Sequence, residues 1–401
     1  MKFEEMNIDP RMLELIHKLG ITEPTEIQEK SIPPGMAGKD VIGQSMTGSG
    51  KTLAFSVPIL HGVKRDGGIQ ALILVPTREL ANQVAEFMHS VSFGGIKVCR
   101  VFGGVSIEPQ ISHLRRAEVV VGTPGRVLDH IERRTIELQN IKFFVLDEAD
   151  RMLDMGFIDD IRRVITKLPK NRQTMLFSAT IPDEIMYIIR NFMKEPVKLK
   201  AQIFVSKHQL KQYYYNVRDE EKLSLLLHLI KKEKPSRAII FTATKRMTSI
   251  VASILRENSV DAEAINGDMP QTKRMNVMEG FHHGKPHILV ATDVASRGLD
   301  IKDVTHIFNF DVPNDPDSYT HRIGRTARME AEGKAITLLS PKDHEPFRHI
   351  IRQVKDIEKV EEPDFPRIQI NMRAHDHRGQ RSGGGFASRS GGRRRSFGRR
   401  Y

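Results

Sequence analysis

A glycine-rich stretch, Ser45–Thr52, carries the clearest chemical signal in the chain. It follows the short apolar run Val41–Ile42, so the segment is typical of a strand, a tight turn and the start of a helix. Gly48 and Gly50 lack a Cβ atom, which lets the backbone curl and point successive N–H groups at an anion. The positive end of the helix dipole would face the same anion. We interpret the stretch as a phosphate-binding loop.

Two side chains at the end of this loop fit a nucleotide and its metal ion. Lys51 would place a positive charge near the outer phosphates, and the Thr52 hydroxyl could ligate Mg²⁺. Ser45 stands where the usual pattern G-x-x-x-x-G-K-[ST] has its first glycine. The alternative is a glycine-rich turn with an incidental lysine, but the strand and helix on either side favour the phosphate interpretation.

Two acids further along the chain are the natural partners of this loop. An acid that leaves a buried strand beside Thr52 could hold Mg²⁺, usually through water. We assign that part to Asp147, and the adjacent Glu148 would polarise an attacking water molecule. The alternative is that both acids only cap the helix that follows them. The phosphate-binding loop upstream favours the catalytic interpretation.

The segment Pro24–Gln28 has two interpretations. Thr25 and Gln28 have the spacing of a capping box, in which each side chain bonds to the backbone of the other residue. A glutamine amide could instead recognise adenine, because it can accept from N6 and donate to N7. The segment alone favours the cap, and the phosphate-binding loop that follows gives weight to the adenine interpretation.

Four apolar runs in the first half of the chain each end in a cluster of polar residues. They are continuous rather than alternating, which is typical of parallel strands buried on both faces. Ligands bind beyond the carboxyl ends of such strands, where all four clusters fall. The runs are Ala71–Val75, Val119–Val121, Phe143–Leu146 and Thr174–Phe177, followed by Pro76–Leu80, Gly122–Arg126, Asp147–Asp150 and Ser178–Thr180. The pattern predicts an α/β lobe with its site at one edge of the sheet.

A second α/β lobe follows a loosely patterned segment, 201–209, which we interpret as a linker. The lobe contains no Gly-Lys-[Ser/Thr] and should not bind a nucleotide unaided. Arg325 and Arg328 are one turn apart, so on a helix they would share a face and suit a transferring phosphoryl group. A basic surface helix is the alternative. The predicted strands of this lobe are Ala238–Phe241, His287–Val290, Thr305–Phe308 and Ala335–Leu339.

Composition limits the class of protein. A chain of 401 residues is too long for one hydrophobic core and predicts two domains. The single cysteine, Cys99, excludes a disulfide framework and favours a reducing compartment. The chain has no apolar run of membrane-spanning length, and its acidic start does not resemble a signal peptide. We therefore expect a cytoplasmic protein without a membrane partner.

The net charge of +12 is concentrated at the C-terminal end. From Arg378 onward the chain has eight arginines and no lysine or acid, so residues 1–377 carry only +4. The tail is rich in Arg, Gly and Ser without an apolar period, which predicts disorder and a polyanionic partner. The alternative is a solvated end with no specific partner.

In this order and spacing, the motifs resemble those of the DEAD-box RNA helicases. The likeness covers about residues 3–365 and includes the tetrapeptide Asp-Glu-Ala-Asp that names the family. It rests on Phe3, Gly20–Gln28, Ser45–Thr52, Pro76–Leu80, Gly103–Gly104, Asp147–Asp150, Ser178–Thr180, Gln271, Arg274 and His321–Arg328.

The resemblance implies an α/β fold of two tandem RecA-like domains, each a mostly parallel sheet with helices on both faces. Domain 1 would span 1–200, the linker 201–209, domain 2 210–365, and a disordered basic tail 366–401. ATP, with Mg²⁺, would lie in the cleft between the domains. Single-stranded RNA would cross both domains.

The resemblance also implies the roles of individual residues. The catalytic residues would be Lys51, Asp147, Glu148, Arg325 and Arg328. ATP would be bound by Gln28, Ser45, Met46, Thr47, Gly48, Ser49, Gly50, Lys51, Thr52 and Asp300, and Mg²⁺ by Thr52 and Asp147. RNA would contact Pro76, Thr77, Arg78, Gly104, Thr123, Arg126, Gln271, Arg274 and Thr292. Hydrolysis would be coupled to strand separation by Ser178, Thr180 and His321.

The leading interpretation is an RNA-dependent ATPase that melts short duplexes or remodels RNA–protein complexes, largely without sequence preference. An ATP-gated RNA clamp would use the same residues. A DNA helicase is disfavoured by the resemblance, and a nucleotide kinase by the lack of a second substrate motif. We expect a monomeric core, with ribonucleoprotein or ribosome-assembly partners as candidates.

Overall fold

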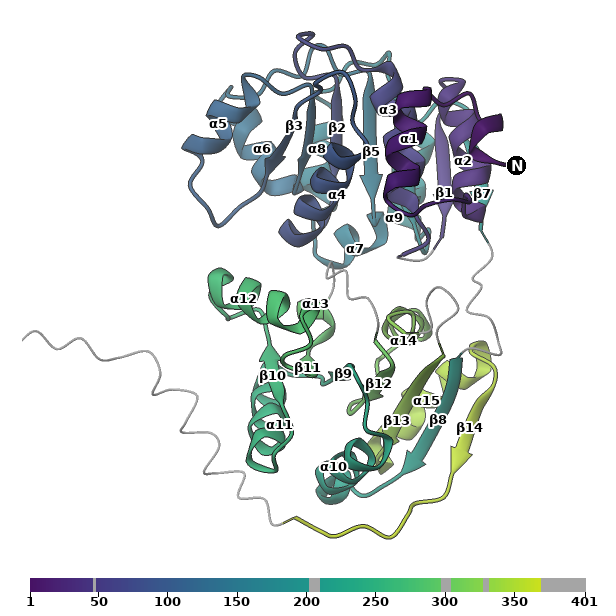
Figure 1. The fold of residues 1–401 in the computed structure, drawn as a ribbon, viewed down its shortest axis with the longest axis vertical. Coiled ribbons are helices and arrows are strands. Elements are labelled where there is room, and N and C mark those ends of the chain that lie inside the picture. The colour runs from purple at the N-terminus through teal and green to yellow at the C-terminus, as the bar shows by residue number, and fades with distance from the viewer. Residues whose placement is uncertain (46–47, 202–209, 297–303, 327–331, 369–401) are drawn as a thin grey trace, which may run out of the picture.

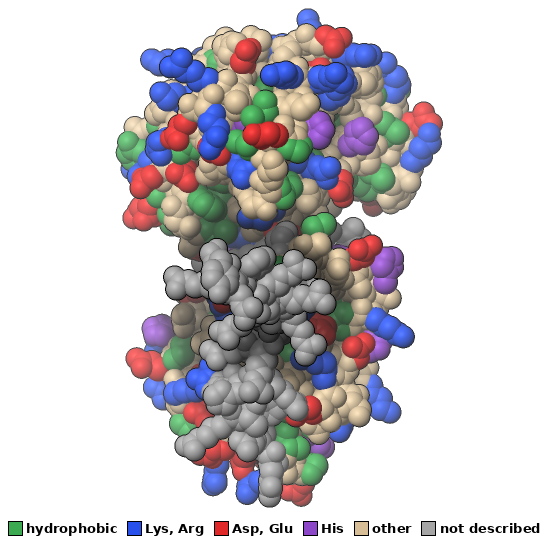
Figure 2. All heavy atoms as spheres, turned by 90° about the vertical axis from the view of Figure 1, so that its left-hand side faces the viewer, with side chains coloured by type: hydrophobic (Ala, Val, Ile, Leu, Met, Phe, Trp, Pro, Cys, Tyr) green, Lys and Arg blue, Asp and Glu red, His purple; other side chains and the backbone are tan. Residues whose placement is uncertain are grey.

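A computed structural model of the protein describes residues 1–45, 48–201, 210–296, 304–326 and 332–368. These residues form two lobes stacked along the long axis of the molecule, each built on a seven-stranded sheet (Figure 1). On the face shown in Figure 2, lysine and arginine side chains are interspersed with acidic ones over both lobes. Among the helices of the described residues, none is both long and apolar enough to cross a membrane.

The first lobe has parallel strands in the order β3-β4-β2-β5-β6-β1-β7. The strands are β1 Val41–Gln44, β2 Ala71–Leu74, β3 Val98–Val101, β4 Val119–Gly122, β5 Phe143–Asp147, β6 Gln173–Ser178 and β7 Val197–Lys200. Alternate residues of a strand point to opposite faces. Ala71 and Ile73 of β2 therefore join one buried cluster, whereas Leu72 and Leu74 join the other.

Helices cover both faces of this sheet. The cluster around Ala71 is closed by the 3₁₀ turn η1 Phe3–Glu5 and by α1 Pro10–Lys18, α2 Glu26–Met36, α3 Lys51–Gly62 and α4 Arg78–Ser90. The opposite cluster is closed by α5 Glu108–Leu114, α6 Pro124–Glu132, α7 Ala149–Asp154, α8 Ile158–Ile165 and α9 Asp183–Phe192. Continuous apolar strands thus meet a helical layer on each side, as parallel sheets require.

The second lobe repeats the topology of the first. Its parallel strands have the order β10-β11-β9-β12-β13-β8-β14, which is the first order with every strand number raised by seven. The strands are β8 Leu210–Asn216, β9 Ala238–Phe241, β10 Ala262–Ile265, β11 Ile288–Ala291, β12 His306–Asn309, β13 Gly333–Leu339 and β14 Ile357–Val360. One face is covered by α10 Lys222–Glu233, which follows η2 Asp219–Glu221, and by α11 Lys245–Glu257. The other is covered by α12 Gln271–His282, α13 Asp293–Ser296, α14 Pro316–Ile323 and α15 His344–Gln353, which follows η3 Pro341–Asp343.

The predicted fold class, two α/β lobes with parallel sheets, is confirmed. Every predicted strand is present, with ends that differ by at most two residues. Five strands, β3, β7, β8, β10 and β14, carried no continuous apolar run and were not predicted. Four of them are the edges of the two sheets. An edge strand is exposed to solvent along one side, so polar residues interrupt its pattern.

The predicted boundary segments fall mostly outside the described residues. This is so for all of the linker 201–209 except Ala201, and for all of the tail 366–401 except its first three residues. Of these three, Arg367 pairs with Glu221 at 2.5 Å, and the Ile368 N–H donates to the Ser224 hydroxyl at 3.1 Å. The described chain thus ends against α10 of the second lobe.

Candidate active site

The phosphate-binding loop starts where β1 ends, at the carboxyl edge of the first sheet. The Ser45 N–H donates to the Ser178 carbonyl of β6 at 3.0 Å, and the Ser49 hydroxyl donates to the Ser45 hydroxyl at 2.9 Å. Gly50 is in the left-handed region, with φ +87°. The loop is therefore tied to the neighbouring strand and turned sharply into α3. Two predicted loop residues, Met46 and Thr47, lie outside the described residues.

Lys51 opens α3 and is buried in the lobe. Its Nζ donates to the Ser45 carbonyl at 3.3 Å and lies 3.9 Å from Oδ1 of Asp147. Thr52 follows as the second residue of the same helix. The Lys51 ammonium group thus lies between the loop and the Asp147 carboxylate, where it could contact the phosphates of a nucleotide.

Gln28 is only 3% exposed, and both ends of its amide are bonded within the lobe. Its Oε1 accepts from the Thr25 N–H at 2.9 Å, which completes the predicted capping box at the start of α2. Its Nε2 donates to the Gly50 carbonyl at 3.0 Å. The cap is confirmed, and the same side chain supports the phosphate-binding loop. The adenine contact stays a prediction, and the amide keeps a second N–H and a second lone pair with which it could make that contact.

Asp147 ends β5 with its carboxylate in the lobe interior. Burial raises the pKa of Asp147 to about 6, against the opposing effect of the Lys51 charge. Its Oδ1 is buried without a hydrogen-bond partner among the described residues. An unsatisfied buried oxygen of this kind is suited to a cation or to the water that a cation carries.

Glu148 turns the chain from β5 into α7. It is a non-glycine residue in the left-handed region, at φ 55°, a conformation that costs free energy and often occurs at functional sites. Its Oε2 accepts from Nη1 of Arg151 at 2.5 Å, and both side chains are buried. The turn and the ion pair together set the direction of the carboxylate.

Asp150 joins this turn to the polar residues that follow β6. Its Oδ2 accepts from the N–H groups of Ala179 and Thr180, at 3.0 and 2.9 Å, and from the Thr180 hydroxyl at 3.3 Å. In return, the Asp150 N–H donates to the Ser178 hydroxyl at 3.1 Å. The carboxylate turn is therefore hydrogen-bonded directly to Ser178–Thr180.

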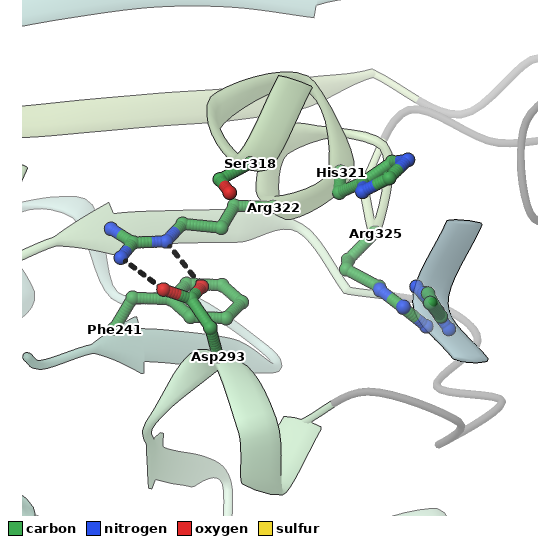
Figure 3. Close-up of a pocket in the computed structure, with 7 residues that line it drawn as sticks. Phe241, Asp293, Ser318, His321, Arg322 and Arg325 are labelled. Atoms are coloured by element: carbon green, nitrogen blue, oxygen red, sulfur yellow. Dashed lines mark hydrogen bonds and ion pairs between the residues drawn. The ribbon is translucent and has the colours of Figure 1, made fainter. Parts of the chain in front are cut away.

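A small pocket at the meeting of the lobes contains the basic groups of the second lobe. It is lined by Arg151 of the first lobe and by Phe241, Asp293, Ser318, His321, Arg322 and Arg325 of the second. Figure 3 shows Arg322 turned toward Asp293 and Phe241, whereas His321 and Arg325 extend to the opposite side. The two arginines of this segment therefore have separate surroundings.

Arg322 is fully engaged within its own lobe. It makes a bidentate pair with Asp293, with both distances 2.7 Å, and its guanidinium lies 4.9 Å from the centre of the Phe241 ring. Nη1 also donates to Oδ1 of Asn309 at 3.1 Å and to the Asp311 carbonyl at 2.6 Å. Such a set of bonds fixes the end of α14 against the start of α13 and against β12.

Arg325 does not lie on a helix, so the helical placement expected for it is wrong. The helix α14 ends at Ile323, and Arg325 lies in a turn closed by its N–H bond to the Arg322 carbonyl. Arg328 lies outside the described residues. The reason is local, because Gly324 caps the helix and Thr326 then pairs with Val304 in an isolated bridge. The Arg325 side chain is nonetheless buried at the interlobe pocket.

His321, in the second lobe, lies close to charged residues of the first lobe. Burial lowers the pKa of His321 to about 4, and the positive charge of Arg151, from the other lobe, acts in the same direction. Asp150 and Glu148, also in the first lobe, oppose the shift. His321 is therefore neutral at neutral pH and lies within the electrostatic reach of the carboxylate turn.

The predicted RNA contacts lie where strands end, in both lobes. Pro76 and Thr77 follow β2, Thr123 follows β4 and Thr292 follows β11. The Thr77 hydroxyl accepts from the Leu80 N–H at 3.2 Å and so caps α4, and the Thr292 hydroxyl accepts from the Ala295 N–H at 3.3 Å. These threonines hold the turns that would meet a nucleic acid backbone.

Arginines cross the same edge. Arg78 passes so close to Gly104 that a Cβ there would lie 2.1 Å from its Nη1, which explains the glycine, at φ +76°. Both Nη atoms of Arg126 donate to the Val105 carbonyl at 3.2 Å.

One predicted RNA contact also bridges the lobes. Nε of Arg274, on α12, lies 3.4 Å from Oε1 of Glu79 on α4, and its Nη2 donates to the Ala295 carbonyl at 2.9 Å. Gln271 begins α12, and Asp300 lies outside the described residues.

Comparisons with known proteins show the family of the chain. Residues 25–188 match the DEAD/DEAH box helicase family, and residues 221–330 match the helicase conserved C-terminal domain. The chain is 44% identical over 367 residues to the DEAD-box ATP-dependent RNA helicase CshA of Geobacillus kaustophilus, a match that covers 90% of this chain and 78% of that protein. The chain belongs to the DEAD-box helicase family.

Two further relatives bear on this DEAD-box protein. The ATP-dependent RNA helicase CshA of Listeria monocytogenes is 46% identical over 347 residues, which cover 85% of this chain and 66% of that protein. The structure of S. cerevisiae Dbp5 bound to RNA and ADP BeF3 matches with a TM-score of 0.82 at 32% identity, over 90% of this chain and 96% of that one. The predicted family, enzyme class and tandem RecA-like fold are confirmed.

Several residues of the DEAD-box site were not predicted from sequence. Asp293 follows a predicted strand and Arg322 lies within the His321–Arg328 motif, so position gave a signal for both. Phe241 ends a buried strand and could not be told from a core residue. Arg151 could not be recognised either, because its role depends on what it faces across the lobes.

Proposed function

We propose that this DEAD-box protein is an RNA-stimulated ATPase that uses ATP to separate short RNA duplexes or to remodel RNA–protein complexes. One observation carries the proposal: Glu148 and Asp150 of the first lobe lie within electrostatic reach of His321, and Arg151 lines one pocket with His321 and Arg325 of the second lobe. Neither lobe alone contains both halves. The names and bound RNA of the relatives described above support ATP and RNA as the ligands.

ATP binding would rest on the first lobe. Backbone N–H groups of the Gly48–Gly50 turn and the start of α3 would hold the phosphates, with the Lys51 ammonium beside them. Gln28 would keep the loop in shape through its bond to the Gly50 carbonyl and could sense the base on its other side. ATP would then order the loop and the carboxylate turn together.

Mg²⁺ fits the residues at this point of the lobe. Asp147 offers a buried oxygen without a hydrogen-bond partner, and Thr52 offers a hydroxyl at the start of α3. The described residues contain no cluster of three or more His, Cys, Asp or Glu that would bind a metal without a nucleotide. Magnesium commonly uses one or two protein ligands and completes its shell with phosphates and water. Once bound, it would neutralise phosphate charge.

Hydrolysis would use residues from both sides of the interface. Glu148 would orient and deprotonate the attacking water, and Arg325, with Arg328, would stabilise the negative charge that develops on the transferred phosphoryl group. Because Asp150 links the carboxylate turn to Ser178 and Thr180, loss of the terminal phosphate would change the position of these residues at the carboxyl edge of the sheet, where RNA would bind.

RNA would lie along the carboxyl edges of both sheets. Contacts from helix-capping turns and from Arg78, Arg126 and Arg274 would address the backbone rather than the bases, which gives affinity without sequence preference. The 2′-hydroxyl would distinguish RNA from DNA.

The direct test is ATP hydrolysis without nucleic acid, with single-stranded RNA and with DNA of the same sequence, followed by displacement of a short labelled RNA strand. We expect RNA alone to raise the rate strongly, and displacement to require hydrolysable ATP. Equal stimulation by DNA would contradict the RNA assignment. RNA held with a non-hydrolysable analogue, without any displacement of a short duplex, would instead favour the ATP-gated clamp.

A further inference from the structure

Arg151 lies at the interface of the two lobes and is not among the site residues predicted from sequence. It is on α7, one turn after Glu148, and its side chain is only 2% exposed. Among the described residues that line the interlobe pocket, it alone comes from the first lobe. A buried guanidinium at such a point needs partners, because burial of an unpaired charge is costly.

The two ends of the Arg151 guanidinium face different surroundings. Nη1 donates to Oε2 of Glu148 at 2.5 Å. Nη2 is buried without a hydrogen-bond partner among the described residues. Nη1 therefore holds the Glu148 carboxylate. Nη2 remains a donor without a partner among the described residues, on a side chain that lines the interlobe pocket.

The electrostatic effect of Arg151 crosses the interface. Its charge is the largest cause, after burial, of the lowered pKa of His321 in the second lobe. Figure 3 shows His321 and Arg325 extending to the same side of the pocket, away from Arg322 and Asp293. Arg151 thus contacts Glu148 directly and acts on His321 of the second lobe through space.

We propose that Arg151 is a positioning residue for hydrolysis, which holds the Glu148 carboxylate in its working orientation and makes that orientation depend on closure of the second lobe. The inference rests on the proposed ATPase function and deepens it. Arg151 acts through Glu148. Without Arg151, the Glu148 carboxylate would lose this 2.5 Å ion pair.

The test compares Arg151→Met, which keeps an unbranched stem and removes the guanidinium, with Arg151→Lys, which keeps the charge. Arg163→Met is the matched control, since Arg163 lies in the same lobe but pairs with Glu132 on the exposed surface. We expect kcat for RNA-stimulated hydrolysis to fall by about tenfold or more in Arg151→Met, because small misplacements of a catalytic group are costly. We expect a partial return in Arg151→Lys and no change in the control. KM for ATP and RNA affinity with a non-hydrolysable analogue should stay within about twofold.

A second comparison separates positioning from mere structural support. In a Glu148→Gln background, Arg151→Met should lower single-turnover hydrolysis little further, because a residue that acts through Glu148 is silent once that carboxylate is gone. The same fold loss in both backgrounds, an unchanged or raised kcat in Arg151→Met, or a loss that simply follows a fall in Tm would overturn the inference. If Arg151→Met does not fold, Arg151→Lys alone and combined with Glu148→Gln decides the point. A parent without RNA-stimulated hydrolysis would remove the proposed function itself, whereas a stimulated parent with a normal Arg151→Met rate would remove only this inference.

Discussion

At the scale of single residues, the site depends on buried charges that compensate one another. Lys51 faces Asp147, and Arg151 faces Glu148, all within the interior of the first lobe. Breaking a buried pair leaves an uncompensated charge, so each of these residues is expected to be sensitive to substitution. Oδ1 of Asp147 has no hydrogen-bond partner among the described residues, so this compensation is incomplete there and a cation fits.

Glu148→Gln should separate ATP binding from ATP hydrolysis. The amide keeps the size of the side chain but cannot accept a proton, so hydrolysis should fall by about a hundredfold or more. Binding of a fluorescent ATP analogue should change little, and RNA should be held longer in the presence of ATP. Glu132→Gln, on the exposed surface, is the control. Hydrolysis at the parental rate in Glu148→Gln would show that another group activates the water.

At the scale of elements, the βα turns at the carboxyl edges hold the chemistry, and their shape depends on glycines and caps. Gly50 illustrates this most clearly. A Cβ there would lie 2.3 Å from Nε2 of Gln28, in a backbone conformation with φ +87°. The turn, the helix α2 and the helix α3 therefore meet at a point that has no room for a side chain.

Gly50→Ala should weaken ATP binding by about tenfold or more, since the alanine must displace the Gln28 amide in addition to the backbone strain of about 1–2 kcal/mol. Gly38→Ala is a matched control, because Gly38 has φ +74° but a Cβ there would meet nothing within 4 Å. Both variants should lose some thermal stability, measured by Tm. Only Gly50→Ala should lose affinity, measured by nucleotide titration, and equal losses of affinity would rule out the Gln28 contact as the cause.

At the scale of the whole molecule, two lobes of the same topology meet through a few charged contacts. Glu79 and Arg274 approach to 3.4 Å across the interface, and His321 lies within reach of Arg151, Asp150 and Glu148. Such contacts are sensitive to salt and pH in a way that the two hydrophobic interiors are not. The arrangement of the lobes should therefore respond to solution conditions under which each lobe stays folded.

Removing the Glu79–Arg274 pair should shift the lobes toward an open arrangement. The distance between lobes can be followed by energy transfer between dyes on Glu137→Cys and Lys232→Cys, because burial raises the pKa of Cys99 to about 11 and leaves it unreactive. We expect Glu79→Gln and Arg274→Gln to have similar effects, and the double variant to add little to either. Fully additive effects would indicate that the two residues act separately.

Acid should also favour opening of the lobes. Because His321 has a pKa of about 4 in the closed arrangement and an ordinary value of 6.5, its contribution to closure is fully present above pH 6.5. Below that pH, protonation favours an open arrangement in which the imidazolium is solvated, and the contribution is lost as pH falls toward 4. In the same dye-labelled protein, His321→Gln should reduce the change in transfer between pH 7 and about 5. A pH response unchanged in His321→Gln would place the titrating group elsewhere.

Much of the site could be predicted from sequence because its chemistry is local. The left-handed turn at Gly50, the capping box of Thr25 with Gln28, and the carboxylates that leave β5 each depend on a few neighbouring residues and one buried strand. Buried parallel strands are continuously apolar, so their order along the chain and the edge that carries the site were also readable.

Only the tertiary structure decided which residues far apart in the chain come into contact. The bond from Gln28 to Gly50, the pair of Arg322 with Asp293 and the contact of Glu79 with Arg274 each join segments whose separate patterns say nothing of the other. The spacing of Arg325 and Arg328 suited a helix, but α14 ends before Arg325, because Gly324 and the bridge at Thr326 stop the helix. Edge strands escaped prediction because solvent on one side permits polar residues. In the sequence, Arg151 looks like an ordinary helical arginine. Folding buries it between the Glu148 carboxylate and the second lobe. The free-energy cost of burying its charge depends on all the groups that folding brings around it, so the sequence alone could not identify it.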